Sequence, residues 1–264
     1  MLEKLARGQI SVDEAEKLLK ILAIEKIGEI AKIDAFREFR KGIPEIILAE
    51  GKRAEDVADI ALTMLKKSGR AIISRASKEQ IDAIKKAFAS EEVDMRIYEE
   101  TGIVAVRKKG FEIKKTGGKI GILAAGTSDI PVAEEAKIVA EEMGCEVITA
   151  YDVGVAGIHR LTSPLKKMIR EDVDAVIVAA GREGALPSVV AGLIDIPVIA
   201  VPTSIGYGLG GKGLSALMAM LQACSLGIAV VNIDGGVAAG AVAALIANRV
   251  ARFRRALDKN AASV

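Results

Sequence analysis

Several residues that can bind anions and move protons stand where a predicted strand gives way to a helix. Asp152 follows the apolar run CEVITA, and His159 and Arg160 come at the start of the next predicted helix. A carboxylate, an imidazole and a guanidinium on one loop can bind an acidic substrate and shuttle a proton. A structural histidine and a solvated arginine are the alternative. We favour the chemical interpretation and assign Asp152 and His159 to catalysis and Arg160 to substrate binding.

An earlier loop, AAGTSDIPV, has the composition of an anion or sugar site. Gly126 permits a sharp turn, and Pro131 suits the first turn of a helix, whose free N–H groups attract phosphate or carboxylate. Asp129 would repel an anion, so a ribose hydroxyl, a proton or magnesium is a better partner for it. Simple N-capping by Ser128 or Asp129 stays an equal alternative at this point. The candidate residues are Gly126, Thr127, Ser128 and, as a catalytic group, Asp129.

Two later loops are rich in glycine. Five glycines between Gly206 and Gly213 are costly to order unless the backbone must approach a ligand closely. No P-loop or dinucleotide-fold glycine pattern is present. A flexible linker is the alternative, but it is a poor connection between core elements of one sheet. From these loops we expect substrate contacts at Gly181, Glu183, Gly184, Pro202, Thr203, Ser204, Gly206, Tyr207, Gly208 and Lys212.

The chain has two cysteines, and neither has the spacing of a zinc site or a disulfide framework. Cys145 starts a core strand at the end of the sheet away from ligands, so we expect it to be inert. Cys224 lies near a helix C-terminus, where the helix dipole disfavours a thiolate. From the pattern alone an inert, buried Cys224 is favoured. A reactive thiolate there would need another positive group, and a cationic substrate ring would supply it.

These residues must be positioned by two α/β units. Charges are dense before residue 115 and thin out later, and a Gly- and Lys-rich segment at 108–119 predicts the boundary between domains 1–115 and 116–264. The first is expected to be a smaller unit that opens with a Ser11/Glu14 capping box and a helical stretch through about Arg40. In the second, five apolar strands alternate with helices, which predicts a five-stranded parallel sheet with its ligand at the carboxyl ends of the strands.

Composition excludes some classes of partner. A net charge of +2 and 3% aromatic residues argue against a nucleic-acid protein. Residues 213–233 carry no charge and are long enough to cross a bilayer, but a buried helix followed by a buried strand explains them better. We therefore expect no membrane partner. The N-terminus lacks the pattern of a signal peptide, and a cytoplasmic location is expected.

The loop motifs together resemble those of LarB proteins, carboxylase-hydrolases in synthesis of the nickel-pincer cofactor of lactate racemase. The resemblance covers residues 118–250 and the segment 34–52. A more distant similarity joins the C-terminal half to PurE, the aminoimidazole ribonucleotide carboxylase. It rests on Ser-Asp after the first strand, Ala-Leu-Pro after the third and Val-Pro after the fourth. The resemblance implies a flavodoxin-like, doubly wound sheet and a homo-oligomer.

The resemblance also implies a reaction. Carbon dioxide would be added to the pyridinium ring of nicotinic acid adenine dinucleotide, and the phosphoanhydride would be hydrolysed to release AMP. Cys224 would be the nucleophile that activates the ring. No tightly bound cofactor is expected; magnesium or Lys and Arg side chains would neutralise the bridging phosphates. The alternatives are a PurE-like carboxylase or mutase, which needs no thiol, and a dinucleotide-binding regulator without chemistry.

Overall fold

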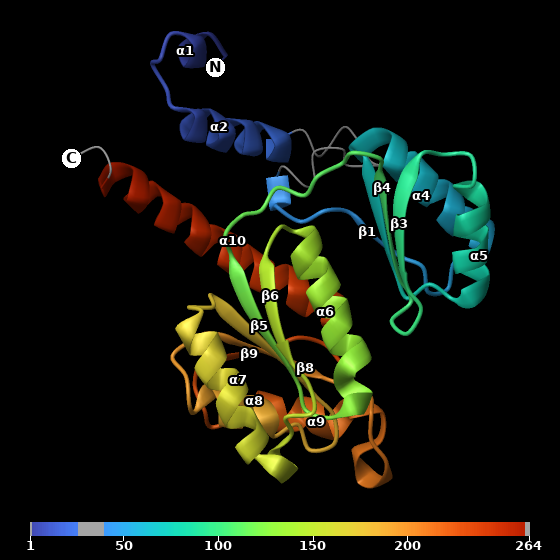
Figure 1. The fold of residues 1–264 in the computed structure, drawn as a ribbon, viewed down its shortest axis with the longest axis vertical. Helices are drawn as coiled ribbons and strands as arrows, with labels where there is room; N and C mark the ends of the chain where they lie inside the picture. The colour runs from blue at the N-terminus through green and yellow to red at the C-terminus, as the bar shows by residue number, and fades with distance from the viewer. Residues whose placement is uncertain (1, 26–39, 262–264) are drawn as a thin grey trace.

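The computed structural model describes residues 2–25 and 40–261, which form two α/β units (Figure 1). The helical stretch expected through about Arg40 lies in part on residues 26–39, outside the described residues. The Ser11/Glu14 capping box is confirmed, because Ser11 N–H donates to Glu14 Oε2 at 2.9 Å and Glu14 N–H donates to Ser11 Oγ at 3.1 Å. The first unit contains α1 (Leu2–Ala6), α2 (Val12–Glu25), β1 (Ile46–Leu48), α4 (Ala54–Ser68), β2 (Arg70–Ser74), α5 (Lys78–Ala87), β3 (Val93–Tyr98) and β4 (Ile103–Lys108).

The sheet of the first unit is mixed, in the order β1-β2-β4-β3, with β1 and β2 parallel. Side chains alternate between its two faces. One face, with Ile73 and Val104, forms a core with α4 and α5. The next residues along the strands, Ile72 and Ile103, are also buried, although they point to the other face. Both faces of this small sheet are therefore covered.

The second unit has the predicted run of strands and helices. The sheet has the order β6-β5-β7-β8-β9 and all pairs are parallel, which is the flavodoxin-like arrangement. The uncharged stretch 213–233, weighed above as a membrane span, forms a helix and the last strand. The elements are β5 (Lys119–Ala124), α6 (Ile130–Glu142), β6 (Glu146–Ala150), α7 (His159–Arg170), β7 (Ala175–Ala180), α8 (Leu186–Ala191), β8 (Val198–Pro202), α9 (Leu214–Leu221), β9 (Ile228–Val230) and α10 (Gly236–Ala261).

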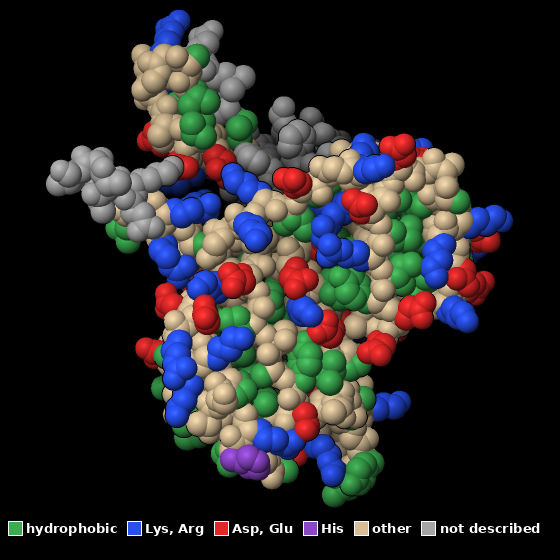
Figure 2. Space-filling model, in the orientation of Figure 1, with side chains coloured by type: hydrophobic (Ala, Val, Ile, Leu, Met, Phe, Trp, Pro, Cys, Tyr) green, Lys and Arg blue, Asp and Glu red, His purple; other side chains and the backbone are tan. Residues whose placement is uncertain are grey.

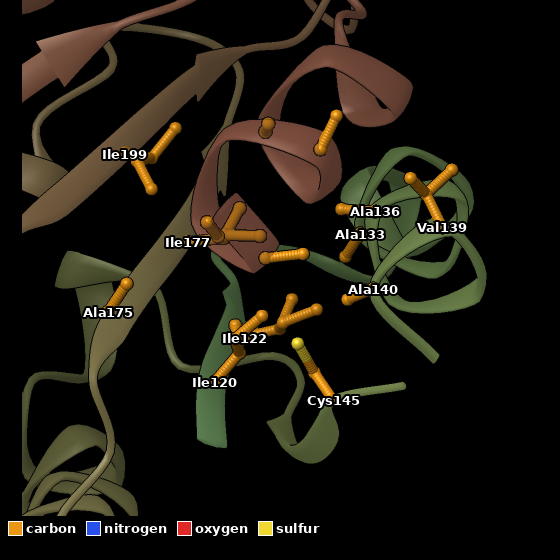
Figure 3. Close-up of a cluster of buried hydrophobic side chains, with 14 of the residues drawn as sticks. Ile120, Ile122, Ala133, Ala136, Val139, Ala140, Cys145, Ala175, Ile177 and Ile199 are labelled. Carbon is orange, nitrogen blue, oxygen red and sulfur yellow. The ribbon is translucent and has the colours of Figure 1, made fainter. Parts of the chain in front are cut away.

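Helices cover both faces of the parallel sheet. On one face, α6 and α10 bury small side chains against Ile122 and Ile177, as Figure 3 shows for the α6 side. On the other face, α7, α8 and α9 bury Leu161, Leu186 and Met220. This double covering explains why the strands are apolar throughout and do not alternate with polar residues.

Small residues let α6 and α10 approach closely. A Cβ atom on Gly240 would lie 2.4 Å from the backbone oxygen of Ala136, and one on Gly236 would lie 2.4 Å from that of Val132. The segment Gly236–Leu257 is long and apolar enough to cross a membrane by length and composition. Ala239, Ala243 and Ala247 of this helix are nevertheless buried in the core cluster with α6 and the sheet, as in a core helix.

The two units share a buried junction. Ile46 of β1 packs against the core cluster of the second unit. Arg70 and Arg107, on neighbouring strands of the first sheet, both bind the carboxylate of Glu142 in α6, whose side chain is 3% exposed. Arg70 also donates to the backbone oxygen of Glu142 at 2.6 Å. A buried ion triad with these contacts fixes the orientation of one unit on the other.

The close approach of α6 and α10 predicts the effect of one added methyl group. Gly240→Ala should lower the free energy of unfolding by about 1–3 kcal/mol, because the new Cβ meets backbone that cannot move aside. Urea unfolding measures the loss. Gly211→Ala is the matched control, since a Cβ there has no atom within 4 Å. Equal stability of the two variants would contradict this packing.

Candidate active site

A cavity of about 740 Å³ lies at the carboxyl edge of the parallel sheet, a volume that suits a small-molecule ligand. The loops that follow β5, β6, β7 and β8 all contribute to it, as the parallel topology predicts. Its lining is Ala125, Gly126, Ser128, Asp129, Asp152, Gly154, Val155, Ala156, Arg160, Ala180, Gly181, Arg182, Glu183, Ala185, Leu186, Ser204, Ile205, Gly206 and Tyr207.

Asp129 is the buried carboxylate at the base of this cavity. Its Oδ1 accepts from the Thr203 hydroxyl at 2.6 Å and its Oδ2 accepts from Gly126 N–H at 2.8 Å. The side chain does not cap α6 itself, but its bond from Gly126 N–H is a capping contact of the short 3-10 turn Thr127–Asp129 that precedes α6. Burial raises the pKa of Asp129, while hydrogen bonds from Thr203, Gly126 and the backbone of Gly181 oppose the rise. One carboxylate thus connects loops from three strands.

Asp152 and Arg160 form an ion pair on the cavity wall. Asp152 has a left-handed backbone with φ of 56°, which turns the chain sharply after β6. Gly157 makes room for the pair, because a Cβ there would lie 2.6 Å from Arg160 Nε. Both side chains are partly exposed, so the guanidinium can take a ligand anion in addition to Asp152.

Arg182 supplies a second cation at the cavity, and its guanidinium packs on the ring of Tyr207. The Arg182 guanidinium lies 4.4 Å from the centroid of the Tyr207 ring, and Ser215 Oγ donates to the Arg182 backbone oxygen at 2.7 Å. Arg182 also has a left-handed φ of 51°, uncommon for a residue with a side chain. Its N–H donates to Ile205 O at 3.1 Å, which ties the loops after β7 and β8 together.

Ten of the eighteen residues that sequence reasoning assigned to the site line the cavity. They are Gly126, Ser128, Asp129, Asp152, Arg160, Gly181, Glu183, Ser204, Gly206 and Tyr207. The remaining eight do not line it: Cys224, Thr127, His159, Gly184, Pro202, Thr203, Gly208 and Lys212.

Some of the eight have another task in the fold. Thr203 is fully buried and donates to Asp129. Gly184 gives α9 room, since a Cβ there would lie 2.8 Å from Ala216 O. His159 is exposed and lines a shallow groove on α7 with Thr162, Ser163, Lys166, Lys167 and Arg170. The positions within the cavity that sequence reasoning missed are mostly apolar, such as Val155 and Ile205, and nothing in their type signals a site.

Cys224 is free and exposed, but it lies in the turn between α9 and β9, four residues before β9 begins. In a parallel sheet this turn is at the amino edge, opposite to the cavity. Cys145 directly precedes β6 at the same edge and is buried. Burial raises the pKa of the Cys145 thiol to about 11, which agrees with the inert role expected for it.

Charges of both signs surround the cavity, and Figure 2 shows them interspersed over the face that it displays. Within residues 2–25 and 40–261, no group of three or more His, Cys, Asp or Glu side chains is placed to hold a metal ion. Asp129, Asp152 and Glu183 therefore act as separate carboxylates and do not form a metal cluster.

The second unit is a flavodoxin-like sheet with a cavity at its carboxyl edge. Comparison with known proteins identifies the class of protein to which it belongs. Residues 119–263 match the AIR carboxylase family. Residues 24–108 match the LarB/PurE-like N-terminal domain. The chain therefore belongs to the LarB family, with a PurE-like C-terminal domain.

Individual known proteins are also similar to this chain. An uncharacterized protein of Methanocaldococcus jannaschii is 49% identical over 242 residues, which are 91% of this chain and 93% of that protein. An N5-carboxyaminoimidazole ribonucleotide mutase of Pyrococcus abyssi is 33% identical over 44% of this chain and 66% of its own length. The protein of that name from M. jannaschii is 34% identical over 44% of this chain and 71% of its own.

The hydrogen bond from Thr203 to the buried Asp129 carboxylate predicts that a variant without this donor loses stability to a degree that depends on pH. Thr203→Val keeps the shape of the side chain and removes a donor to a buried carboxylate, which should cost about 2 kcal/mol at pH 8. The cost should shrink as the pH falls through the raised pKa of Asp129, because a protonated carboxyl needs the donor less. Thermal unfolding at several pH values measures it. Thr162→Val, on the exposed side of α7, is the control, and a loss independent of pH would contradict this role.

Glu135 is a second buried carboxyl, and its raised pKa predicts that the free energy of unfolding falls as the pH rises. Burial raises the pKa of Glu135 to about 7, opposed by the charge of Arg75 and by the N–H of Val237. The folded protein then holds this proton more tightly than the unfolded chain, so stability is lost as pH rises from about 4.5 to 7. Glu135→Gln should add up to about 3 kcal/mol at pH 8 and little at pH 4. Glu146→Gln, at an exposed site, should change neither value, and an unchanged pH profile in Glu135→Gln would refute the assignment.

Proposed function

We propose that this chain carboxylates the pyridinium ring of nicotinic acid adenine dinucleotide and hydrolyses its phosphoanhydride, giving AMP and a dicarboxylated mononucleotide. Membership of a carboxylase-type family supports the class of reaction. The observation that carries the finer proposal is the LarB-type N-terminal domain on the same chain as the AIR carboxylase domain. The free, exposed thiol of Cys224 supports the covalent step.

The proposed chemistry starts from an electron-poor ring. The Cys224 thiolate adds to ring carbon 4, which makes carbon 5 an enamine carbon that attacks carbon dioxide. A base then takes the proton from carbon 5, and the thiolate leaves carbon 4 with its electron pair so that the pyridinium is restored. Asp152, a partly exposed carboxylate of the cavity, is the base that we propose. Arg160 and Arg182 would bind the phosphates during hydrolysis by water.

The position of Cys224 places a condition on this mechanism. The thiol and the cavity lie at opposite edges of one sheet, so Cys224 must act in the cavity of another copy of the chain. We therefore propose a homo-oligomer that brings the α9–β9 turn of one copy to the cavity of the next. Exposed apolar side chains near both surfaces support such a contact: Leu221 and Leu226 beside Cys224, Tyr207 in the cavity lining, and Leu209 two residues after it.

A second candidate function is a PurE-like carboxylase or mutase acting on an aminoimidazole ribonucleotide. The absence of Cys224 from the cavity lining of its own chain favours it, because an electron-rich aminoimidazole needs no thiol. Similarity to N5-carboxyaminoimidazole ribonucleotide mutases over 44% of this chain supports the same alternative.

Complementation between variants tests the first proposal. Cys224→Ala and Arg160→Ala should each lose carboxylation of the dinucleotide, measured by mass spectrometry with labelled bicarbonate. Mixed as subunits at equal amounts, they should regain about a quarter of the wild-type activity, since pocket and thiol then come from different copies. Full activity of Cys224→Ala with the aminoimidazole ribonucleotide would establish the second candidate. No recovery on verified subunit mixing would refute catalysis between copies.

A further inference from the structure

Two residues with left-handed backbones meet where the first unit touches the second. Arg75 follows β2 with φ of 54°, and Asp234 follows β9 with φ of 53°. Arg75 Nη2 donates to the backbone oxygen of Asp234 at 2.8 Å. Left-handed conformations are costly for residues with side chains, and they persist where surrounding contacts impose them, often at functional sites. The contacts at this junction therefore hold both backbone segments in one defined conformation.

Asp234 is bound in turn to the cavity wall. Its Oδ1 accepts from Ser204 N–H at 2.8 Å, and its own N–H donates to Pro202 O at 2.8 Å. Ser204 lines the cavity, and Pro202 is the last residue of β8. A chain of hydrogen bonds therefore runs from Arg75 in the N-terminal domain to the segment after β8 that borders the ligand space.

Arg75 itself is anchored from both units. Its Nη1 lies 3.3 Å from Glu50 Oε2, on the loop after β1. Its charge also acts on the buried carboxyl of Glu135 in α6, which faces Asp234 and the N–H of Val237 at the start of α10. The guanidinium is planar and has several donors, so one side chain can satisfy Glu50 and Asp234 together. A lysine could not make both contacts with the same geometry.

We propose that Arg75 is a positioning residue by which the N-terminal domain sets the place of the Ser204 segment through Asp234. The proposal takes the cavity as the substrate site, as the proposed function does, but it does not depend on which reaction occurs there. It gives the N-terminal domain a definite task, which is to shape a cavity that none of the domain's described residues lines. The domain would do this without contacting the substrate.

Amide hydrogen exchange of the segment containing Ser204 tests the proposal without substrate. Arg75→Gly removes the side chain and tolerates the left-handed backbone, and exchange at Ser204 should become about tenfold faster, as expected for loss of the hydrogen bond that the charged guanidinium donates to Asp234 O. Asp234→Gly removes the carboxylate that accepts from Ser204 N–H, so exchange at Ser204 should also become faster in this variant. Arg75→Lys should give an intermediate rate. Exchange in β7 should stay unchanged in all three.

Asp172→Gly is the matched control. Asp172 also has a left-handed φ of 54° and an exposed ion pair, with Arg254, but it lies between α7 and β7, at the other edge of the sheet. Calorimetry with AMP provides a second reading, and affinity should fall about tenfold in Arg75→Gly and Asp234→Gly but not in the control. Unchanged exchange at Ser204 in Arg75→Gly, or faster exchange with unchanged AMP affinity, would overturn the proposal. Wild-type protein without carboxylase activity would refute the proposed function and leave this exchange result valid.

Discussion

One buried carboxylate joins the loops that make the cavity. Asp129 accepts from Gly126 after β5 and from Thr203 after β8, and the backbone of Gly181 after β7 also hydrogen-bonds to it. Burial alone would disfavour its charge, so the three donors and the charge depend on one another. A Cβ on Gly181 would lie 2.6 Å from Thr203 Oγ1, which shows how closely the loops are drawn together. Arg182 and Ser204 directly follow Gly181 and Thr203, so their positions depend on this arrangement.

Much of this architecture could be predicted from residue patterns. The five apolar strands and their helices are where the sequence places them, and parallel topology alone brings Asp129, Asp152 and Glu183 to one edge. The pattern cannot tell a glycine that approaches a ligand from one that approaches another segment of the chain. Gly184 and Gly213 are of the second kind, because a Cβ on either would lie 2.8 Å from the backbone of Ala216 or Thr203.

Cys224 shows where sequence reasoning stopped short. Cys145 was expected to be remote from ligands because it begins a strand, and the same topological argument applies to Cys224, which precedes β9. Family resemblance implies a catalytic role for Cys224 but contains no information on whether the thiol would act in its own chain or in a neighbouring copy. Likewise, no motif marks Arg75, because its importance comes from contacts with Glu50 and Asp234, which are distant in sequence and meet only in the folded chain.

The proposed mechanism requires a Cys224 thiolate that reaches the pyridinium ring from a neighbouring subunit. The most direct measurement is an experimental structure of the assembled protein with the dinucleotide bound, read at the separation between Cys224 Sγ and pyridinium carbon 4. The account predicts a neighbour's Sγ at about 3–4 Å from that carbon, a distance suited to attack. A ring bound in the cavity with every Cys224 facing solvent or far from it would contradict the mechanism.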